Sequence, residues 1–205
     1  MHRTRLISAF AILAFSSAAA WAVPDGPMLP RNAPEVSQDP KTNARNNYNQ
    51  GHDAIQSVAK LELEALSMPG MASQYRDSIR SNLERARESF RKAVAADPQM
   101  KEGWNMLGFT SRKLGQYEES LSAYEKALAL SPDYPEAIEY RAELFLLTGR
   151  LEQTKESYAR LLKLDAGYAA TLKASMQDFL KGNKSFPSSV SQKERDDFTA
   201  WVNTL

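Results

Sequence analysis

The sequence contains no cysteine and only two histidines among its 205 residues. Without cysteine it can form neither a disulfide nor a thiolate metal site. His52 is the one histidine outside the N-terminal segment, and neither Gln56 nor Ala59, one and two helical turns further along, is a strong zinc ligand. No Gly-x-Ser-x-Gly motif is present. These absences argue against a zinc enzyme and a serine hydrolase, and we expect no metal and no cofactor.

The chain also lacks an excess of charge of either sign. Its 26 Lys and Arg residues face 25 Asp and Glu residues, which gives a formal net charge of +1. A nucleic-acid-binding protein would need a basic patch, so a nucleic-acid partner is not expected. The glycines are scattered and form no phosphate-binding loop.

Long apolar stretches are absent except near the N-terminus. Arg3 and Arg5 precede an uncharged stretch at 6–20, and Ala20-Trp21-Ala22 fits a small-x-small cleavage site. This pattern predicts a secretory signal peptide over residues 1–22, cleaved after Ala22. An uncleaved membrane anchor is the alternative, but the stretch is short for a bilayer span of roughly 20 residues. We therefore expect a periplasmic or secreted protein with no stable membrane span after cleavage.

Two further absences bear on the compartment. No cysteine follows the apolar stretch, so a bacterial lipid anchor is not expected. Extracellular animal proteins of this size more often carry disulfides, so the missing cysteines favour a bacterial envelope.

Residues 23–43 hold half of the ten prolines in the chain and show no apolar periodicity. This composition predicts a proline-rich, disordered linker. A proline-rich peptide ligand is the alternative interpretation.

The most informative feature of the sequence is an internal repeat. The segments Lys101–Tyr134 and Pro135–Tyr168 have the same length and the same pattern of residues. In each copy, apolar residues at helical spacing predict a helix, a glycine suited to a left-handed helix end follows, and a second apolar stripe predicts a returning helix. Pro132 ends the returning helix of the first copy, and Pro135 opens the next helix. The identical pairs are Glu102/Glu136, Gly115/Gly149, Glu118/Glu152, Tyr124/Tyr158, Leu128/Leu162, Leu130/Leu164 and Tyr134/Tyr168.

A period of about 34, with Trp-x-x-Leu-Gly from Trp104 and Ala then Pro at Ala127 and Pro132, resembles the tetratricopeptide repeat (TPR) family. The resemblance implies an all-α, right-handed α-solenoid of antiparallel helix pairs that binds other proteins and seldom carries chemistry. Asp165-Ala166 stands where the family pattern has Asp-Pro.

The flanking segments extend the same pattern. Residues 44–100 predict an extended N-terminal helical hairpin, with helices over 44–66 and 74–96. It is a degenerate repeat whose helices and turn are longer than those of the two later copies, so it should project from the stack. Residues 169–205 predict C-terminal capping helices, the last one opened by a capping box at Ser191–Glu194. The total is about three repeats plus a cap, which makes one domain.

In tetratricopeptide repeats, residues of the first helix that face neither core line a concave groove. By spacing, the predicted protein-binding groove comprises Glu102, Asn105, Phe109, Arg112, Glu136, Glu139, Glu143 and Leu146. Arg45, Tyr48 and His52 would extend it at one end, and Lys173 and Gln177 at the other.

The acidic residues of this groove indicate the charge of its partner. Some relatives clamp a terminal carboxylate, but Glu139 and Glu143 would repel one. We therefore expect a protein or peptide with basic and apolar side chains; the alternative is that the glutamates form only a solvated face. On this interpretation neither glutamate faces the core, so reversing both charges should leave folding nearly intact, whereas Trp104 should be deeply buried.

Three functions are consistent with the sequence. The first is a non-catalytic periplasmic or secreted scaffold that binds a protein segment in the groove. The second is an accessory subunit of an envelope complex that docks through the N-terminal hairpin or the C-terminal helix. The third is a cell-envelope enzyme with an unrecognised site.

Overall fold

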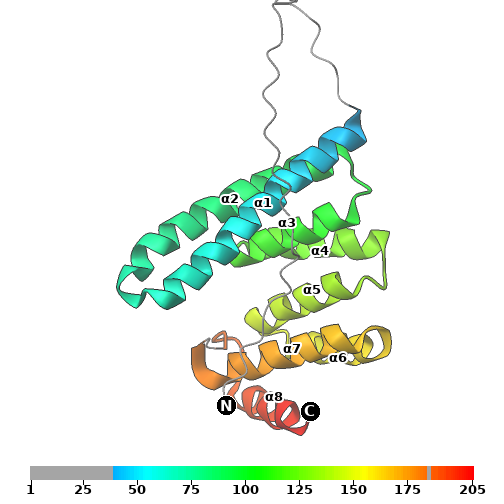
Figure 1. Ribbon diagram of the computed structural model, residues 1–205. Helices are drawn as coiled ribbons and strands as arrows, with labels where there is room; N and C mark the ends of the chain where they lie inside the picture. The colour runs from blue at the N-terminus through cyan, green and yellow to red at the C-terminus, as the bar shows by residue number, and fades with distance from the viewer. Residues whose placement is uncertain (1–38, 184–185) are drawn as a thin grey trace, which may run out of the picture. The chain divides into compact units, whose positions relative to one another are not determined.

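The computed structural model describes residues 39–183 and 186–205. The predicted signal peptide and most of the predicted linker lie outside these residues. The described residues form eight α-helices and contain no strand, which confirms the all-α prediction (Figure 1).

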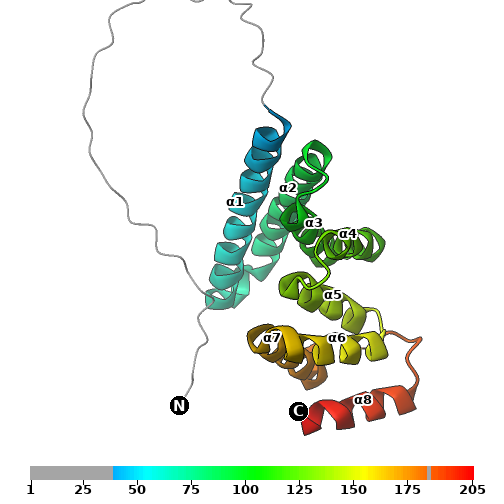
Figure 2. The same ribbon diagram turned by 90° about the vertical axis from the view of Figure 1, so that its right-hand side faces the viewer.

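Successive helices form antiparallel pairs that follow one another in layers (Figure 2). The first pair, α1 and α2, is joined by a 3-10 turn, and α7 continues into a single π turn before the last loop. The bounds are α1 Pro40–Ser67, the 3-10 turn Pro69–Met71, α2 Ala72–Ala96, α3 Lys101–Lys113, α4 Tyr117–Leu130, α5 Pro135–Leu147, α6 Leu151–Leu164, α7 Ala166–Asp178, the π turn Phe179–Asn183 and α8 Gln192–Thr204.

Helix α1 begins earlier than its sequence pattern predicts. Asp39 caps it, because its Oδ2 accepts a hydrogen bond from the Thr42 backbone N–H at 3.2 Å. Pro40 occupies the first turn, where its missing N–H costs nothing. The prediction of a linker was therefore wrong for residues 40–43, since proline opens this helix instead of preventing it.

The α1–α2 hairpin is about twice as long as the other helix pairs. Its helices contain 28 and 25 residues, whereas α3 to α6 contain 13 or 14 each. The loop end of the hairpin extends beyond α3 and α4, as the repeat phase predicts (Figure 1).

The two copies of the repeat use the same local contacts. The Ser120 hydroxyl donates to the Gly108 carbonyl at 2.8 Å, and the Thr154 hydroxyl, at the equivalent position of the second copy, donates to the Ala142 carbonyl at 3.5 Å. Helices α3 and α5 are each followed by a left-handed glycine, Gly115 with φ 77° and its equivalent Gly149 with φ 76°. Only glycine adopts this conformation without strain, so the predicted helix ends are confirmed.

The apolar core consists of two clusters that meet at Trp104. One cluster joins α1 to α4 around Phe90 and Leu107, and the other joins α4 to α8 around Ile138 and Leu172. Trp104 is half-buried, packs against both clusters, and donates from Nε1 to the Pro98 carbonyl at 2.9 Å. It was predicted to be buried between the two helices of its repeat; the structure leaves part of its side chain exposed.

Helix α8 covers the end of the stack, as its apolar face predicts. Phe198 and Val202 are fully buried, and the Trp201 ring packs edge-on against Tyr158 with centroids 5.8 Å apart. The predicted capping box is present between Ser191 and Glu194.

Candidate functional site

The predicted groove residues lie on α3 and α5, which pack side by side, with α7 as the next neighbour of α5. Asn105, Glu139 and Lys173 are each one repeat period apart, so they occupy equivalent places on these successive helices.

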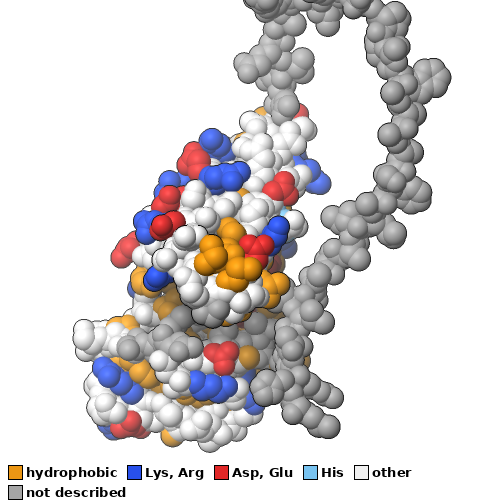
Figure 3. Space-filling model, turned by 60° about the vertical axis from the view of Figure 1, so that its left-hand side comes forward, with side chains coloured by type: hydrophobic (Ala, Val, Ile, Leu, Met, Phe, Trp, Pro, Cys, Tyr) orange, Lys and Arg blue, Asp and Glu red, His pale blue; other side chains and the backbone are white. Residues whose placement is uncertain are grey.

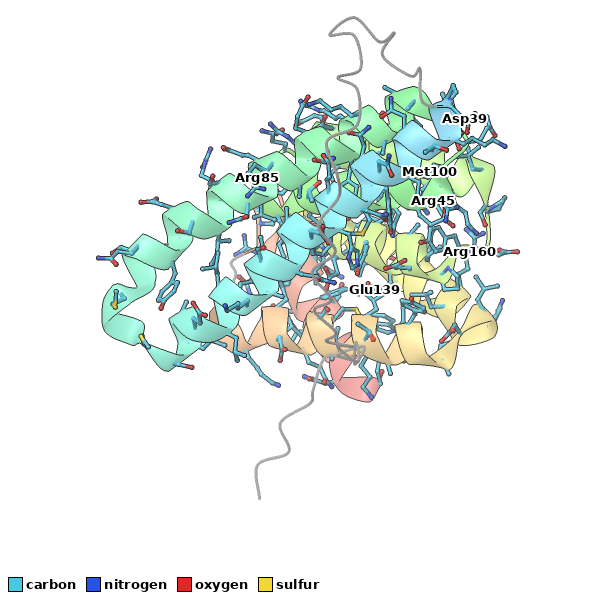
Figure 4. All side chains as sticks on the ribbon, turned by 45° about the horizontal axis from the view of Figure 1, so that its top comes forward. Asp39, Arg45, Arg85, Met100, Glu139 and Arg160 are labelled. Atoms are coloured by element: carbon cyan, nitrogen blue, oxygen red, sulfur yellow. The ribbon has the colours of Figure 1, made fainter. Side chains whose placement is uncertain are left out.

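Four of the eight predicted residues are buried. Asn105, Arg112, Glu139 and Leu146 are buried, whereas Phe109, Glu136 and Glu143 are half-buried and Glu102 is exposed. The prediction that Glu139 and Glu143 both face solvent was wrong for Glu139, which is 1% exposed and lies near the middle of the helices (Figure 4). Neighbouring first helices close over these positions, and a pattern within one helix does not reveal that.

Arg112 is the centre of a polar network that joins three helices. Its Nη1 pairs with Glu143 Oε2 at 2.5 Å, and its Nε donates to the Tyr124 hydroxyl at 3.4 Å. The Ser175 hydroxyl on α7 donates to Glu143 Oε1 at 2.6 Å. The guanidinium also lies 5.6 Å from the ring centre of Phe109 and 5.7 Å from that of Tyr140. Arg112 and Glu143 therefore tie α3, α5 and α7 together.

A pocket of about 300 Å³ opens beside this network. Its apolar lining, from α5 and the π turn that follows α7, could accept an aliphatic or aromatic side chain. The exposed Asp178 also lines the pocket and pairs with Lys181 at 3.3 Å. Three of the predicted groove residues line it. The full lining is Arg112, Glu143, Leu146, Leu147, Ser175, Asp178 and Phe179.

Asn105 and Glu139 are buried polar groups that lack partners. Both Oδ1 and Nδ2 of Asn105, and Oε1 of Glu139, are without a hydrogen bond. Burial, followed by the nearby charge of Glu143, raises the pKa of Glu139 to about 8, although Arg112 acts in the opposite direction. The surroundings of this carboxyl group therefore favour its protonated form.

Acids and tyrosines gather where α3 and α5 begin. The Tyr134 hydroxyl donates to Glu136 Oε2 at 2.6 Å. Burial, followed by the charges of Glu136 and Glu102, raises the pKa of Tyr48. Tyr48 stacks on the exposed His52 with centroids 6.4 Å apart. Lys101 also lies here, with its ammonium 4.8 Å from the ring centre of Tyr134 and 4.0 Å from Glu102 Oε1.

A second surface lies at the loop end of the α1–α2 hairpin, where apolar side chains gather (Figure 3). Leu63 and Leu66 are 67% and 80% exposed, and Met68 and Met71 are 51% and 43% exposed. The prediction of two helices over 44–66 and 74–96 did not identify this patch. The signal was the apolar run around the Pro69-Gly70 turn, which has no opposite element to pack against.

Within residues 39–183 and 186–205, no three histidine, aspartate or glutamate side chains gather as a candidate metal site. In the same ranges no helix combines the length and the apolar character that a bilayer span needs.

Residues 101–134 match the sequence model of the tetratricopeptide repeat, so the chain carries such a repeat there and the resemblance seen in the sequence is confirmed. No curated protein matches the chain. Among solved structures, the chain is similar to the crystal structure of MamA protein, with a TM-score of 0.46 and 14% identity over 78% of this chain and 88% of that chain.

Proposed function

We propose that this protein, which carries a tetratricopeptide repeat at 101–134, is a periplasmic or secreted scaffold that binds a segment of another protein along α3, α5 and α7, without catalysis of its own. Stacked repeats of this kind present extended concave surfaces to protein partners. The observation that carries the proposal is the pocket of about 300 Å³ between α5 and α7, which is lined by three predicted groove residues.

The partner segment should carry an apolar side chain and basic side chains. The apolar part of the pocket, which would hold the apolar side chain of the partner, is formed by Leu146, Leu147 and Phe179. The exposed acids are Glu102, 4.0 Å from the Lys101 ammonium, and Asp178, which pairs with Lys181 at 3.3 Å. Both pairs are exposed to solvent and contribute little, so a basic side chain of the partner can replace either lysine. Exposed ion pairs contribute little each, so the apolar contact supplies most of the affinity while the acids set rate and selectivity.

The location is supported by the sequence of residues 1–22 alone. N-terminal sequencing of the protein from its source cell tests it. A mature chain that begins at Val23 and is recovered from the envelope fraction or the medium agrees with the proposal, and an intact N-terminus in the cytosol contradicts it.

Charge reversal at the exposed groove acids tests the binding mode. The variant Glu102→Lys with Asp178→Lys should lose the partner that the tagged mature chain recovers, most clearly at low salt. Glu118→Lys with Glu156→Lys is the matched control, because both residues are exposed on the second helices α4 and α6. If both double variants recover the partner equally well, the partner binds outside this groove.

The hairpin patch favours a second candidate, an accessory subunit of an envelope complex that docks through the α1–α2 loop end. The variant Leu63→Ser with Leu66→Ser changes two exposed apolar residues of this patch. If it loses the partner while the groove variant keeps it, the accessory-subunit function replaces the scaffold. The C-terminal helix is a weaker docking surface, because its apolar face already packs on the stack.

A further inference from the structure

Helix α2 contains 25 residues and α3 only 13, so the half of α2 next to the hairpin loop extends beyond α3 (Figure 1). A cleft of about 500 Å³ lies where the end of α3 meets this part of α2. Its lining comes from the segment 73–83 of α2 and from Lys113 and Leu114 at the end of α3. This α2–α3 cleft is formed mainly by the second helix of a pair, so it lies outside the groove of the first helices.

The lining of the α2–α3 cleft carries more positive than negative charge. Among the described residues that line it, Arg76, Arg80 and Lys113 are basic and only Asp77 is acidic. All four side chains are exposed to solvent. A cleft lined by cations raises the local concentration of anionic groups, so its charge favours an acidic ligand.

The same side of α2 shows, closer to its C-terminal end, how arginines of this kind are paired. Arg87 and Arg91 follow Arg76 and Arg80 by 11 residues each (76 to 87 and 80 to 91), which is about three turns, so all four lie on one side of α2. Arg91 pairs with Glu119 of α4 at 2.6 Å, and Arg87 lies 4.0 Å from the same carboxylate. One acid of the next helix pair therefore bridges two arginines that are four residues apart.

The two arginines nearer the hairpin loop lack such an acid. Arg80 pairs with Glu84 of its own helix at 3.1 Å, and the two side chains are 71% and 48% exposed. Within residues 39–183 and 186–205, Arg76 has no ion pair. Lys113 pairs with the exposed Glu62 at 3.0 Å. Exposed pairs contribute little, so a carboxylate of another molecule can replace Glu84 or Glu62 at small cost.

We infer that the α2–α3 cleft is a second docking site, which binds an acidic segment of a partner protein. A carboxylate of that segment lies beside Arg76 and Arg80, as Glu119 lies beside the two arginines three turns away. Ile79 and Leu114 line the cleft and are half-buried, so an apolar side chain next to the carboxylate packs against them. The site goes beyond the proposed groove, because it uses other residues and selects a segment of the opposite charge.

The experiment measures the binding of short fluorescent peptides to the mature chain by fluorescence anisotropy. Each peptide has acetylated and amidated ends and carries one leucine and two glutamates at varied separation, and its twin carries glutamines instead. The wild type should bind the glutamate peptides more tightly than their twins. The preference should shrink as salt is added, because salt screens the attraction between exposed charges.

Two double variants with the same change in net charge locate the contact. Arg76→Gln with Arg80→Gln should bind the glutamate peptides about tenfold more weakly at low salt, with the affinity for the glutamine twins unchanged. Arg85→Gln with Lys92→Gln is the matched control, because both residues are exposed on α2 and neither lines the cleft. The control should bind both sets of peptides as the wild type does.

Three results would overturn the inference. The wild type binds glutamate and glutamine peptides equally, or the two double variants lose affinity by the same factor, which would show a response to net charge alone. The third is that vesicles of an anionic phospholipid bind the wild type but not Arg76→Gln with Arg80→Gln, while no peptide binds; the cations would then contact a lipid surface.

The groove variant separates this inference from the proposed function. Glu102→Lys with Asp178→Lys changes no residue of the α2–α3 cleft, so it should keep the affinity for the glutamate peptides even where it loses the groove partner. Failure of the glutamate peptides therefore leaves the groove function standing. Circular dichroism of each variant shows that a loss of binding is not a loss of folding.

Discussion

Gly108 lies directly against the ring of Tyr124: a Cβ atom built on Gly108 would be 2.5 Å from the Tyr124 Cε1. The same relationship occurs one helix pair earlier, where a Cβ on Gly51 would be 2.7 Å from the ring of Phe90. Both rings are fully buried. In each helix pair, the glycine lies on the first helix and the aromatic ring on the second. The ring fills the space that a side chain in place of the glycine would need.

Gly108→Ala should therefore destabilise the protein. The Tyr124 ring cannot swing aside, because it is buried and its hydroxyl accepts a hydrogen bond from Arg112. Overpacking of this kind costs about 1–3 kcal/mol, and the better helix propensity of alanine offsets at most about 1 kcal/mol of it. Urea denaturation measures the difference in the free energy of unfolding.

Gly70→Ala is the matched control for this substitution. A Cβ on Gly70 would meet no atom within 4 Å, and the residue has no left-handed backbone that would be strained. The same chemical change should leave stability unchanged or raise it by a few tenths of a kcal/mol. Equal effects of Gly70→Ala and Gly108→Ala would contradict the close approach of α3 and α4.

Trp104→Ala should destabilise the chain and weaken its cooperativity. Because Trp104 is half-buried, the cost should be about 2–4 kcal/mol, toward the lower end of the range for buried aromatics. Its ring touches both apolar clusters, so its loss should separate the unfolding of the α1–α4 end from that of the α5–α8 end. Fluorescence of Trp201 and far-ultraviolet circular dichroism would then give different midpoints. Coincident midpoints would show that other contacts couple the two clusters.

The elements that sequence reasoning predicts well are those specified by local chemistry. Gly115, the capping box at Ser191 and the apolar face around Phe198 each need only a few neighbouring residues to be recognised. The repeat period then relates equivalent positions of the two copies, as it does for Gly115 and Gly149.

The burial of polar groups between neighbouring helices could not be predicted in this way. Helical spacing places Asn105 and Glu139 on the side of α3 and α5 that faces away from the second helices, but it does not say how closely α3 and α5 approach each other. Arg141 is another such case: it stands where Leu107 fills the core of the first copy, and it remains half-buried with its guanidinium 5.3 Å from the ring centre of Phe145. Tertiary packing decides these positions.

The pairing of Arg112 with Glu143 corrects the expectation that charges on α5 can be reversed freely. Glu143→Lys would set an ammonium beside a guanidinium whose side chain is 7% exposed. Breaking a buried pair on one side typically costs about 3–5 kcal/mol, because an uncompensated charge remains. Replacing both partners, as in Arg112→Met with Glu143→Leu, should restore most of that stability. A thermal melt of the single and double variants checks this, and a double variant no better than Glu143→Lys would show that the pair does not act as a unit.

Glu139 should make the protein less stable as the pH rises. Its pKa in the folded chain, about 8, lies above its ordinary value of 4.5, so the folded state binds its proton more tightly than the unfolded state does. Unfolding then releases a proton between these values, and stability falls progressively as the pH rises from about 4.5 through about 8.

Substitution of Glu139 by glutamine tests this directly, because glutamine has nearly the same shape and does not titrate. Urea denaturation of wild type and Glu139→Gln across this pH range should show the variant gaining on the wild type as the pH rises, with the largest advantage above pH 8. The exposed control Glu156→Gln should show no such trend. If the difference between Glu139→Gln and wild type is independent of pH, Glu139 is ionised in the folded protein and has a partner for its charge.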